Sequence, residues 1–270
     1  MTAFSARKTE SSRLPNPRRS IRLVQRNLMV YRHTWMVIFT GFFEPLFYLL
    51  ALGLGVGDLI GTIPGPGGQE LTYRQFVGPG LLAASCMNGA ISDGFFNIFF
   101  KLHFQRTYEG ILATPLRVAD VTLGEMMWAL TRGTLYATGF LVILWQMDVL
   151  LSPWAVLALP AAIFISASFS AFALAITSFV KKIQQFDVVM NLLVMPMFLF
   201  STTFFPLSQV APPLRVAIQF SPLFHAISLL RALTTGVVGW GTLIHVLALL
   251  VLMLGCLSLA MFRLEKHIMK

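Results

Sequence analysis

Charged residues are scarce in this sequence of 270 residues. Asp, Glu, Lys and Arg make up 11% of the chain and hydrophobic residues 56%, whereas soluble domains have about 25% charged residues. So few charges cannot cover the water-facing surface of a chain this long, and a bilayer removes that need because its interior is hydrocarbon. The composition therefore excludes a soluble globular domain and indicates a membrane protein.

The sequence also lacks residues that several kinds of chemistry require. Its two cysteines, Cys86 and Cys256, both lie in apolar runs, and its five histidines are scattered, so we predict no disulfide framework and no metal site. No lysine follows a glycine-rich loop of the G-x-x-x-x-G-K-[ST] type. The chain should therefore bind no cofactor and should not be an enzyme that hydrolyses ATP.

Six apolar runs approach the roughly 20 residues that a transmembrane helix needs. They cover residues 35–56, 76–100, 121–146, 154–180, 188–205 and 242–262. We predict an all-α integral membrane protein whose six transmembrane helices belong to one domain, residues 20–262. A disordered tail, residues 1–19, precedes this domain, and a short polar tail, residues 263–270, follows it.

The segment from Ser20 to His33 has an amphipathic pattern. Its apolar residues recur at helical spacing and its polar residues fall on the other face; they are Ile21, Val24, Leu28 and Tyr31, against Arg22, Gln25, Arg26 and Arg32. Such a basic helix is suited to the headgroup layer of membrane lipids. The alternative is a simple extension of the first span.

The distribution of positive charge predicts the orientation. With the N-terminus in the cytoplasm, 16 of the 20 Lys and Arg residues lie on the cytoplasmic side, Arg132 lies within a span, and only Arg74, Arg215 and Arg231 lie outside. Positive residues are retained on the cytoplasmic side, so we expect both termini there, in the cell (inner or plasma) membrane. The net charge of +9 is then explained by the membrane surface, and no nucleic-acid partner is needed.

Three charged residues interrupt the apolar runs at similar depth. Glu44, Asp93 and Arg132 lie about 12–16 Å from the cytoplasmic ends of their runs at ~1.5 Å per residue. Because charge within a membrane is usually paired, we expect Arg132 to neutralise Asp93 or Glu44. The cluster either fixes helix packing or lines a substrate path. Glu125, only four residues into its run, should reach the headgroups.

Two further patterns leave two interpretations each. In the cytoplasmic segment 101–125, Tyr108, Ile111 and Leu112 share one helical face and Pro115 would end the helix; the segment either docks on a partner protein or is a plain linker. In the first run, aromatic residues recur every four positions, at Phe39, Phe43 and Phe47. They either face lipid and pack, or they form a path for a lipid-linked substrate.

Three segments resemble type-2 ABC transporter permeases. QRTYEGILATPLRVADVTLGE resembles the family's cytoplasmic loop, and FLFSTTFFPLSQVAPPLRVAIQFSPLFHAISLLRALTTG resembles its signature. EPLFYLLALGLGVG, from Glu44 to Gly57, is similar to the lipo-oligosaccharide (nodulation-factor) exporter branch, which is related to drug-export permeases. The residues that carry the first two resemblances are Glu109, Pro115 and Gly124, and Pro206, Pro213, Pro222, Arg231 and Gly236.

The resemblance implies an ATP-driven exporter. Two separate ABC ATPase subunits would bind ATP and Mg²⁺ below a homodimer of this permease, and residues 206–236 would form short re-entrant helices on the outer side. The residues that would couple to the ATPase are Tyr108, Glu109, Ile111, Leu112 and Pro115. The cargo would be a lipo-oligosaccharide, a glycolipid or a hydrophobic drug, moved outward by alternating access.

Two other functions stay open on the residues alone. A membrane-embedded enzyme acting on lipid-linked sugars would need carboxylates or histidines gathered at one face, and the outer loops offer only Asp58, Glu70 and Asp148. An ion-coupled secondary transporter would instead use Glu44, Asp93 and Arg132 and would work without an ATPase.

Overall fold

The computed structural model describes residues 17–31, 43, 46–103 and 118–268. Helices dominate this part of the chain. The elements in chain order are α2 (Pro17–Tyr31), η1 (Ala51–Val56), α4 (Gly57–Ile60), β1 (Thr62–Pro64), η2 (Pro66–Gly68), β2 (Glu70–Thr72), α5 (Tyr73–Ser92), η3 (Asp93–Asn97), α6 (Ile98–His103), α8 (Val118–Gln146), η4 (Pro153–Leu157), α9 (Ala158–Thr177), α10 (Gln184–Val189), η5 (Met190–Val194), α11 (Met195–Phe200), η6 (Leu207–Gln209), α12 (Pro212–Gln219), α13 (Pro222–Thr235) and α14 (Trp240–Ile268).

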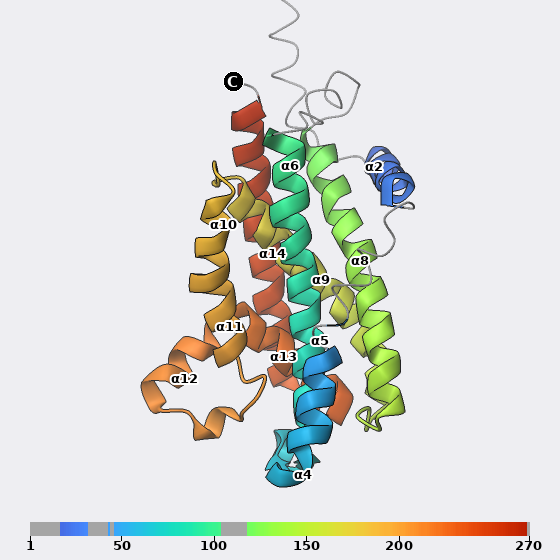
Figure 1. Cartoon of the computed structure of the whole chain (residues 1–270), viewed down its shortest axis with the longest axis vertical. Helices are drawn as coiled ribbons and strands as arrows, with labels where there is room; N and C mark the ends of the chain where they lie inside the picture. The colour runs from blue at the N-terminus through green and yellow to red at the C-terminus, as the bar shows by residue number, and fades with distance from the viewer. Residues whose placement is uncertain (1–16, 32–42, 44–45, 104–117, 269–270) are drawn as a thin grey trace, which may run out of the picture.

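The long helices run side by side along the long axis of the molecule (Figure 1). α9 packs against α5, α8 and α14, and α13 packs against α5 and α14. α6 ends, α8 begins and α14 ends at the same end of the molecule, which we call the C-terminal end (Figure 1). The small antiparallel hairpin of β1 and β2, with Ile63 opposite Leu71, lies beyond α4 at the other end, which we call the hairpin end.

α5 forms the centre of the hydrophobic core. Its side chains are buried along most of the helix, including Phe76, Leu81, Met87 and Ile91. Small residues allow close packing where α5 continues into η3: a Cβ at Gly94 would collide with the Cβ of Ala173 on α9. By contrast, only 11% of the apolar window of α14 is buried inside the chain, against 61% for the helix that contains α9. α14 therefore offers most of its surface to lipid or to another chain.

Three described helices are long and apolar enough to cross a membrane, namely Asp120–Gln146, Pro153–Thr177 and Trp240–Arg263. α12 and α13, bent by 84° at the break between them, add a fourth if they count as one span. The three agree with predicted runs. The run 76–100 is also helical, as α5, η3 and α6, whereas the run 35–56 lies largely outside the described residues. The arrangement of six spans therefore stays a prediction.

The proline-rich signature folds as short helical pieces. Pro206 precedes η6, Pro213 is the second residue of α12, and Pro222 is the first residue of α13. Proline fits a first helical turn because the missing N–H has no partner there in any case. Gly236 ends α13 in the left-handed conformation (φ 85°), with Ser152 Oγ 2.8 Å from where a Cβ would lie. That these short helical pieces are re-entrant in a membrane stays a prediction.

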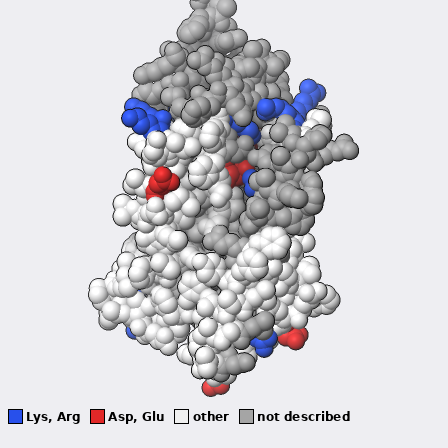
Figure 2. Space-filling view, in the orientation of Figure 1, with Lys and Arg blue, Asp and Glu red and all other residues white. Residues whose placement is uncertain are grey.

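The visible surface suits a bilayer. In Figure 2, charged side chains gather toward the upper, C-terminal end and a few mark the hairpin end, with a broad uncharged band between them. The described chain is thus an all-α membrane protein apart from one two-stranded hairpin.

Candidate functional site

A buried ion pair joins η3, which continues α5, to α8 in the interior. Arg132 Nη1 donates to Asp93 Oδ1 over 2.6 Å, and its Nη2 donates to the Tyr136 hydroxyl over 3.0 Å. Gly89, one turn before Asp93, makes room for the ring, because a Cβ there would lie 2.9 Å from Tyr136 Cδ2. The structure thus brings together one of the two pairings that the depth argument allowed, while Glu44 lies outside the described residues.

A second buried ion pair joins α6 to α8 nearer the C-terminal end. Lys101 Nζ lies 2.9 Å from both carboxylate oxygens of Glu125 and 3.3 Å from Asn27 Oδ1 of α2. Asn27 Nδ2 donates to Glu125 Oε2 over 3.4 Å. The expectation that Glu125 reaches the headgroups is therefore wrong: its side chain is 1% exposed, because a lysine from the neighbouring helix compensates its charge inside the protein.

A π-helical segment aligns the two pairs. Arg132 and Glu125 are seven residues apart on α8, so they share a face, whereas Asp93 and Lys101 are eight apart on the opposing helix. An uninterrupted α-helix would leave residues eight apart about 80° out of line at ~100° per residue. The segment η3 starts at Asp93 and has wider turns, which absorb the extra residue. Thr177 of α9 donates to the carbonyl of Gly94 in this segment over 2.9 Å.

α2 is docked on the start of α8. Ser20 Oγ donates to the carbonyl of Asp120 over 2.9 Å, and Leu23 lies against Gly124. The helix agrees with the prediction, and the predicted apolar residues Ile21 and Leu28 do not pack against the described protein. Ser20, Leu23 and Asn27 are buried, whereas Ile21 and Leu28 are exposed. The hydrogen bonds of the two polar residues compensate their burial, which leaves the apolar residues directed away from the protein.

Arg231 of α13 ties three parts of the fold together. Its Nη2 donates to the carbonyls of Phe76 (3.1 Å) and Thr202 (2.9 Å), and its Cζ lies 3.9 Å from the centre of the Phe76 ring. Thr202 has a positive φ of 66°, rare for a β-branched residue. Arg231, which the orientation count placed outside, is therefore a buried structural cation that holds the turn before η6 against α5.

Two further outcomes concern the remaining candidates. The coupling residues Tyr108, Glu109, Ile111, Leu112 and Pro115 lie outside the described residues. The histidines were expected to be scattered, yet the structure brings His225 and His245 together, with their Nδ1 atoms 2.8 Å apart between α13 and α14. A separation of 20 positions gave no signal of this pairing.

Together these contacts make a braced pair of helices. α5–α6 and α8 are fixed in register by two ion pairs about 11 Å apart along the axis. The segment that contains residues 104–117 connects α6 to α8. Asn27 of α2 forms hydrogen bonds with both members of the ion pair nearest to that segment, Lys101 and Glu125. These contacts tie α2, α5–α6 and α8 to one another.

The class of protein follows from this geometry: apolar helices around buried, compensated charges form a polytopic membrane protein. Residues 20–235 match the ABC-2 type transporter family. The chain belongs to this family and is the membrane component, or permease, of a transporter.

Relatives of known name support this assignment. The chain is 31% identical to nodulation protein J of Rhizobium leguminosarum bv. trifolii over 195 residues, which is 72% of each chain. It is 28% identical to nodulation protein J of Sinorhizobium fredii over 235 residues, covering 87% of this chain and 88% of the relative. The resemblance to the nodulation-factor exporter branch is thereby confirmed.

Proposed function

We propose that this chain is the permease subunit of an ATP-driven exporter and that two ABC ATPase subunits dock at its C-terminal end. The ATPases supply the ATP and Mg²⁺ sites. The cargo is an amphiphile of the lipo-oligosaccharide, glycolipid or hydrophobic drug class, moved outward by alternating access of two permease copies. Both chain termini lie in the cytoplasm.

One observation carries this proposal beyond the family assignment. The segment predicted to couple to the ATPase connects α6 and α8, and the Lys101–Glu125 pair joins these helices close to its two ends. ATP-driven closure of the ATPases would push on this segment. Because the two ion pairs resist sliding of one helix past the other, the push would be transmitted to the interior as a rigid-body movement.

The exposed surface of α14 favours assembly with a second copy or with lipid, and a homodimer is the symmetric arrangement for two permeases. The interior contacts do not require a second chain, because both buried pairs are completed within one copy.

The direct test is assembly with an ABC ATPase from the same organism. A cysteine introduced at Tyr108 should cross-link to the ATPase in the purified complex, and Tyr108→Ala or Glu109→Ala should lower transport-linked ATP hydrolysis without reducing membrane insertion. A cysteine at Trp154, exposed on η4 near the hairpin end, is the matched control and should not label the ATPase. An assembled complex in which Tyr108 fails to cross-link would overturn the proposed coupling.

A further inference from the structure

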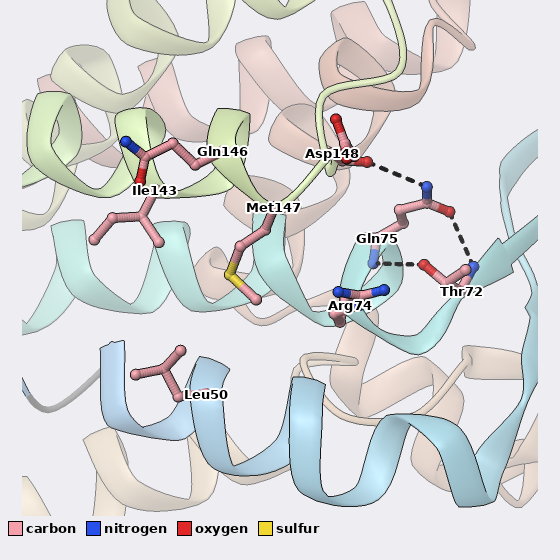
Figure 3. Close-up of a pocket in the computed structure, with 8 residues that line it drawn as sticks. All are labelled: Leu50, Thr72, Arg74, Gln75, Ile143, Gln146, Met147 and Asp148. Carbon is pink, nitrogen blue, oxygen red and sulfur yellow. Dashed lines mark hydrogen bonds between the residues drawn. The ribbon is translucent and has the colours of Figure 1, made fainter.

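A pocket of about 400 Å³ opens at the hairpin end of the molecule. It lies between helical residues 46–50, the start of α5, and the end of α8 with the turn that follows (Figure 3). Its volume falls in the range of ~300–1,000 Å³ that is usual for small-molecule sites. It is separate from the two buried ion pairs, which involve none of its lining residues.

The scaffold of the pocket is held by hydrogen bonds. Thr72 and Gln75 form a capping box at the start of α5, with distances of 3.0 and 3.4 Å. Gln75 Nε2 also donates to the carbonyl of Asp148 over 3.3 Å, as Figure 3 shows. Asp148 has a left-handed backbone (φ 56°), which Asp tolerates better than most residues. The first turn of α5 and the turn after α8 are thereby fixed relative to each other.

Three polar groups remain available after these bonds are made. The guanidinium of Arg74, the amide of Gln146 and the carboxylate of Asp148 line the pocket and form no side-chain hydrogen bond or ion pair with the described part of the chain. The stem of Arg74 is held from behind, because a Cβ at Gly53 would lie 2.9 Å from Arg74 Cγ. The pocket therefore presents donors and acceptors that its own scaffold does not use.

The rest of the lining is apolar and continues as a stripe. Leu50, Ile143 and Met147 line the pocket, and Figure 3 shows Met147 extending toward the helix that bears Leu50. Phe47 precedes Leu50 by three positions within helical residues 46–50, so the two share one face. The rings of Phe43 and Phe47 stack with their centroids 5.8 Å apart, and the two residues are 44% and 62% exposed. These exposed apolar residues continue the apolar lining away from the pocket.

We propose that this pocket binds the glycosyl headgroup of an amphiphile whose acyl chain lies along Phe43, Phe47 and Leu50. One positive and one negative side chain give the pocket no net charge, which disfavours a phosphate or carboxylate beside Asp148. A purely apolar ligand would bury three polar groups without partners, at a cost. Sugar hydroxyls can satisfy all three, and the C–H face of a sugar ring can rest on Met147. The inference rests on the proposed function only in treating this molecule as cargo.

The experiment is native mass spectrometry of the purified full chain with test lipids of identical acyl chains: monoglucosyl diacylglycerol, phosphatidylglycerol and diacylglycerol. The glucosyl lipid should bind about tenfold more tightly than diacylglycerol, the equivalent of one or two net hydrogen bonds. Gln146→Leu should remove most of this preference. Gln209→Leu, the same change at an exposed position outside the pocket, should keep it. Gly53→Ala should lower it by displacing Arg74.

Two results would overturn the inference. Equal binding of the glucosyl lipid and diacylglycerol, with unchanged melting temperature of the protein, would show that the polar groups are not used. Stronger binding of phosphatidylglycerol that Arg74→Gln abolishes would make this an anion site. Neither result affects the proposed exporter, which is tested by assembly with the ATPase. Conversely, failure of that assembly would not change the binding preference for the glucosyl lipid measured here.

Discussion

Leu23 of α2 occupies the space that a side chain at Gly124 of α8 would need. A Cβ on Gly124 would lie 2.6 Å from Leu23 Cδ1 and 2.9 Å from Leu23 Cβ. The glycine at this position of the cytoplasmic-loop signature thus has a packing reason: it lets the N-terminal helix approach α8 closely enough for Asn27 to reach Glu125.

Gly124→Ala should loosen α2. Overpacking of this kind costs about 1–3 kcal/mol, and we expect faster tryptic cleavage at Arg22 and Arg26 in detergent-solubilised protein. Gly255→Ala is the control, since nothing lies within 4 Å of its Cβ position, and it should leave cleavage unchanged. Adding Leu23→Ala to the Gly124 variant should restore part of the protection. Equal cleavage of all variants would contradict the docked position of α2.

Arg132→Ala should destabilise the protein strongly. It removes one member of a buried ion pair, which costs roughly 3–5 kcal/mol, so the melting temperature and the yield of folded protein should both fall. The double variant Asp93→Leu/Arg132→Met removes both charges and should recover much of the loss. Lys181→Ala, at an exposed position, should have little effect. A single variant as stable as the parent would show that the pair does not hold α5 to α8.

Arg231→Met should destabilise the contact between α13, α5 and the turn at Thr202. Hydrogen bonds from a charged donor contribute about 1.5–3 kcal/mol, and two carbonyls lose theirs. Arg231→Lys should recover only part of the stability, because its single ammonium cannot reproduce the fork that reaches Phe76 and Thr202. Thermal unfolding followed by circular dichroism measures both. Full recovery by lysine would mean that charge alone matters there.

A reporter active only outside the cell should give no signal when it is fused to Lys270. The expectation follows from the excess of Lys and Arg in the segments assigned to the cytoplasm. The same reporter inserted after Gly67, in the hairpin, should give a strong signal because the hairpin lies at the opposite end (Figure 1). The reverse pattern would overturn the proposed orientation.

Local features of the fold were predictable from the sequence. Long apolar runs gave the helices at 121–146, 154–180 and 242–262, because hydrophobic length needs no knowledge of neighbours. Pro222 and Gly236 mark the two ends of α13, because proline suits a first helical turn and glycine suits the left-handed residue after the last turn. Depth counting placed Asp93 and Arg132 at similar levels, and the structure brings them together.

Features that depend on partner helices were not predictable. Lys101 was assigned to a cytoplasmic segment and Glu125 to the headgroups. Counting residues from the end of an apolar run cannot show that Lys101, at the end of one run, forms an ion pair with Glu125, near the start of the next. The docking of α2 was not indicated for a related reason: Ser20 and Asn27 are buried through hydrogen bonds that α8 and α6 supply. The pocket combines three separate segments, so no local pattern indicated it.

The π-helical segment at Asp93 has a consequence for insertions and deletions. Removing one residue from positions 94–97 would leave Asp93 and Lys101 seven positions apart, the same spacing as Glu125 and Arg132 on α8. An uninterrupted α-helix would then hold both charges in line with their partners, because residues seven apart share a helical face. A homologue with a one-residue gap at this position should therefore keep both acidic–basic pairs and lack the π-helical turn.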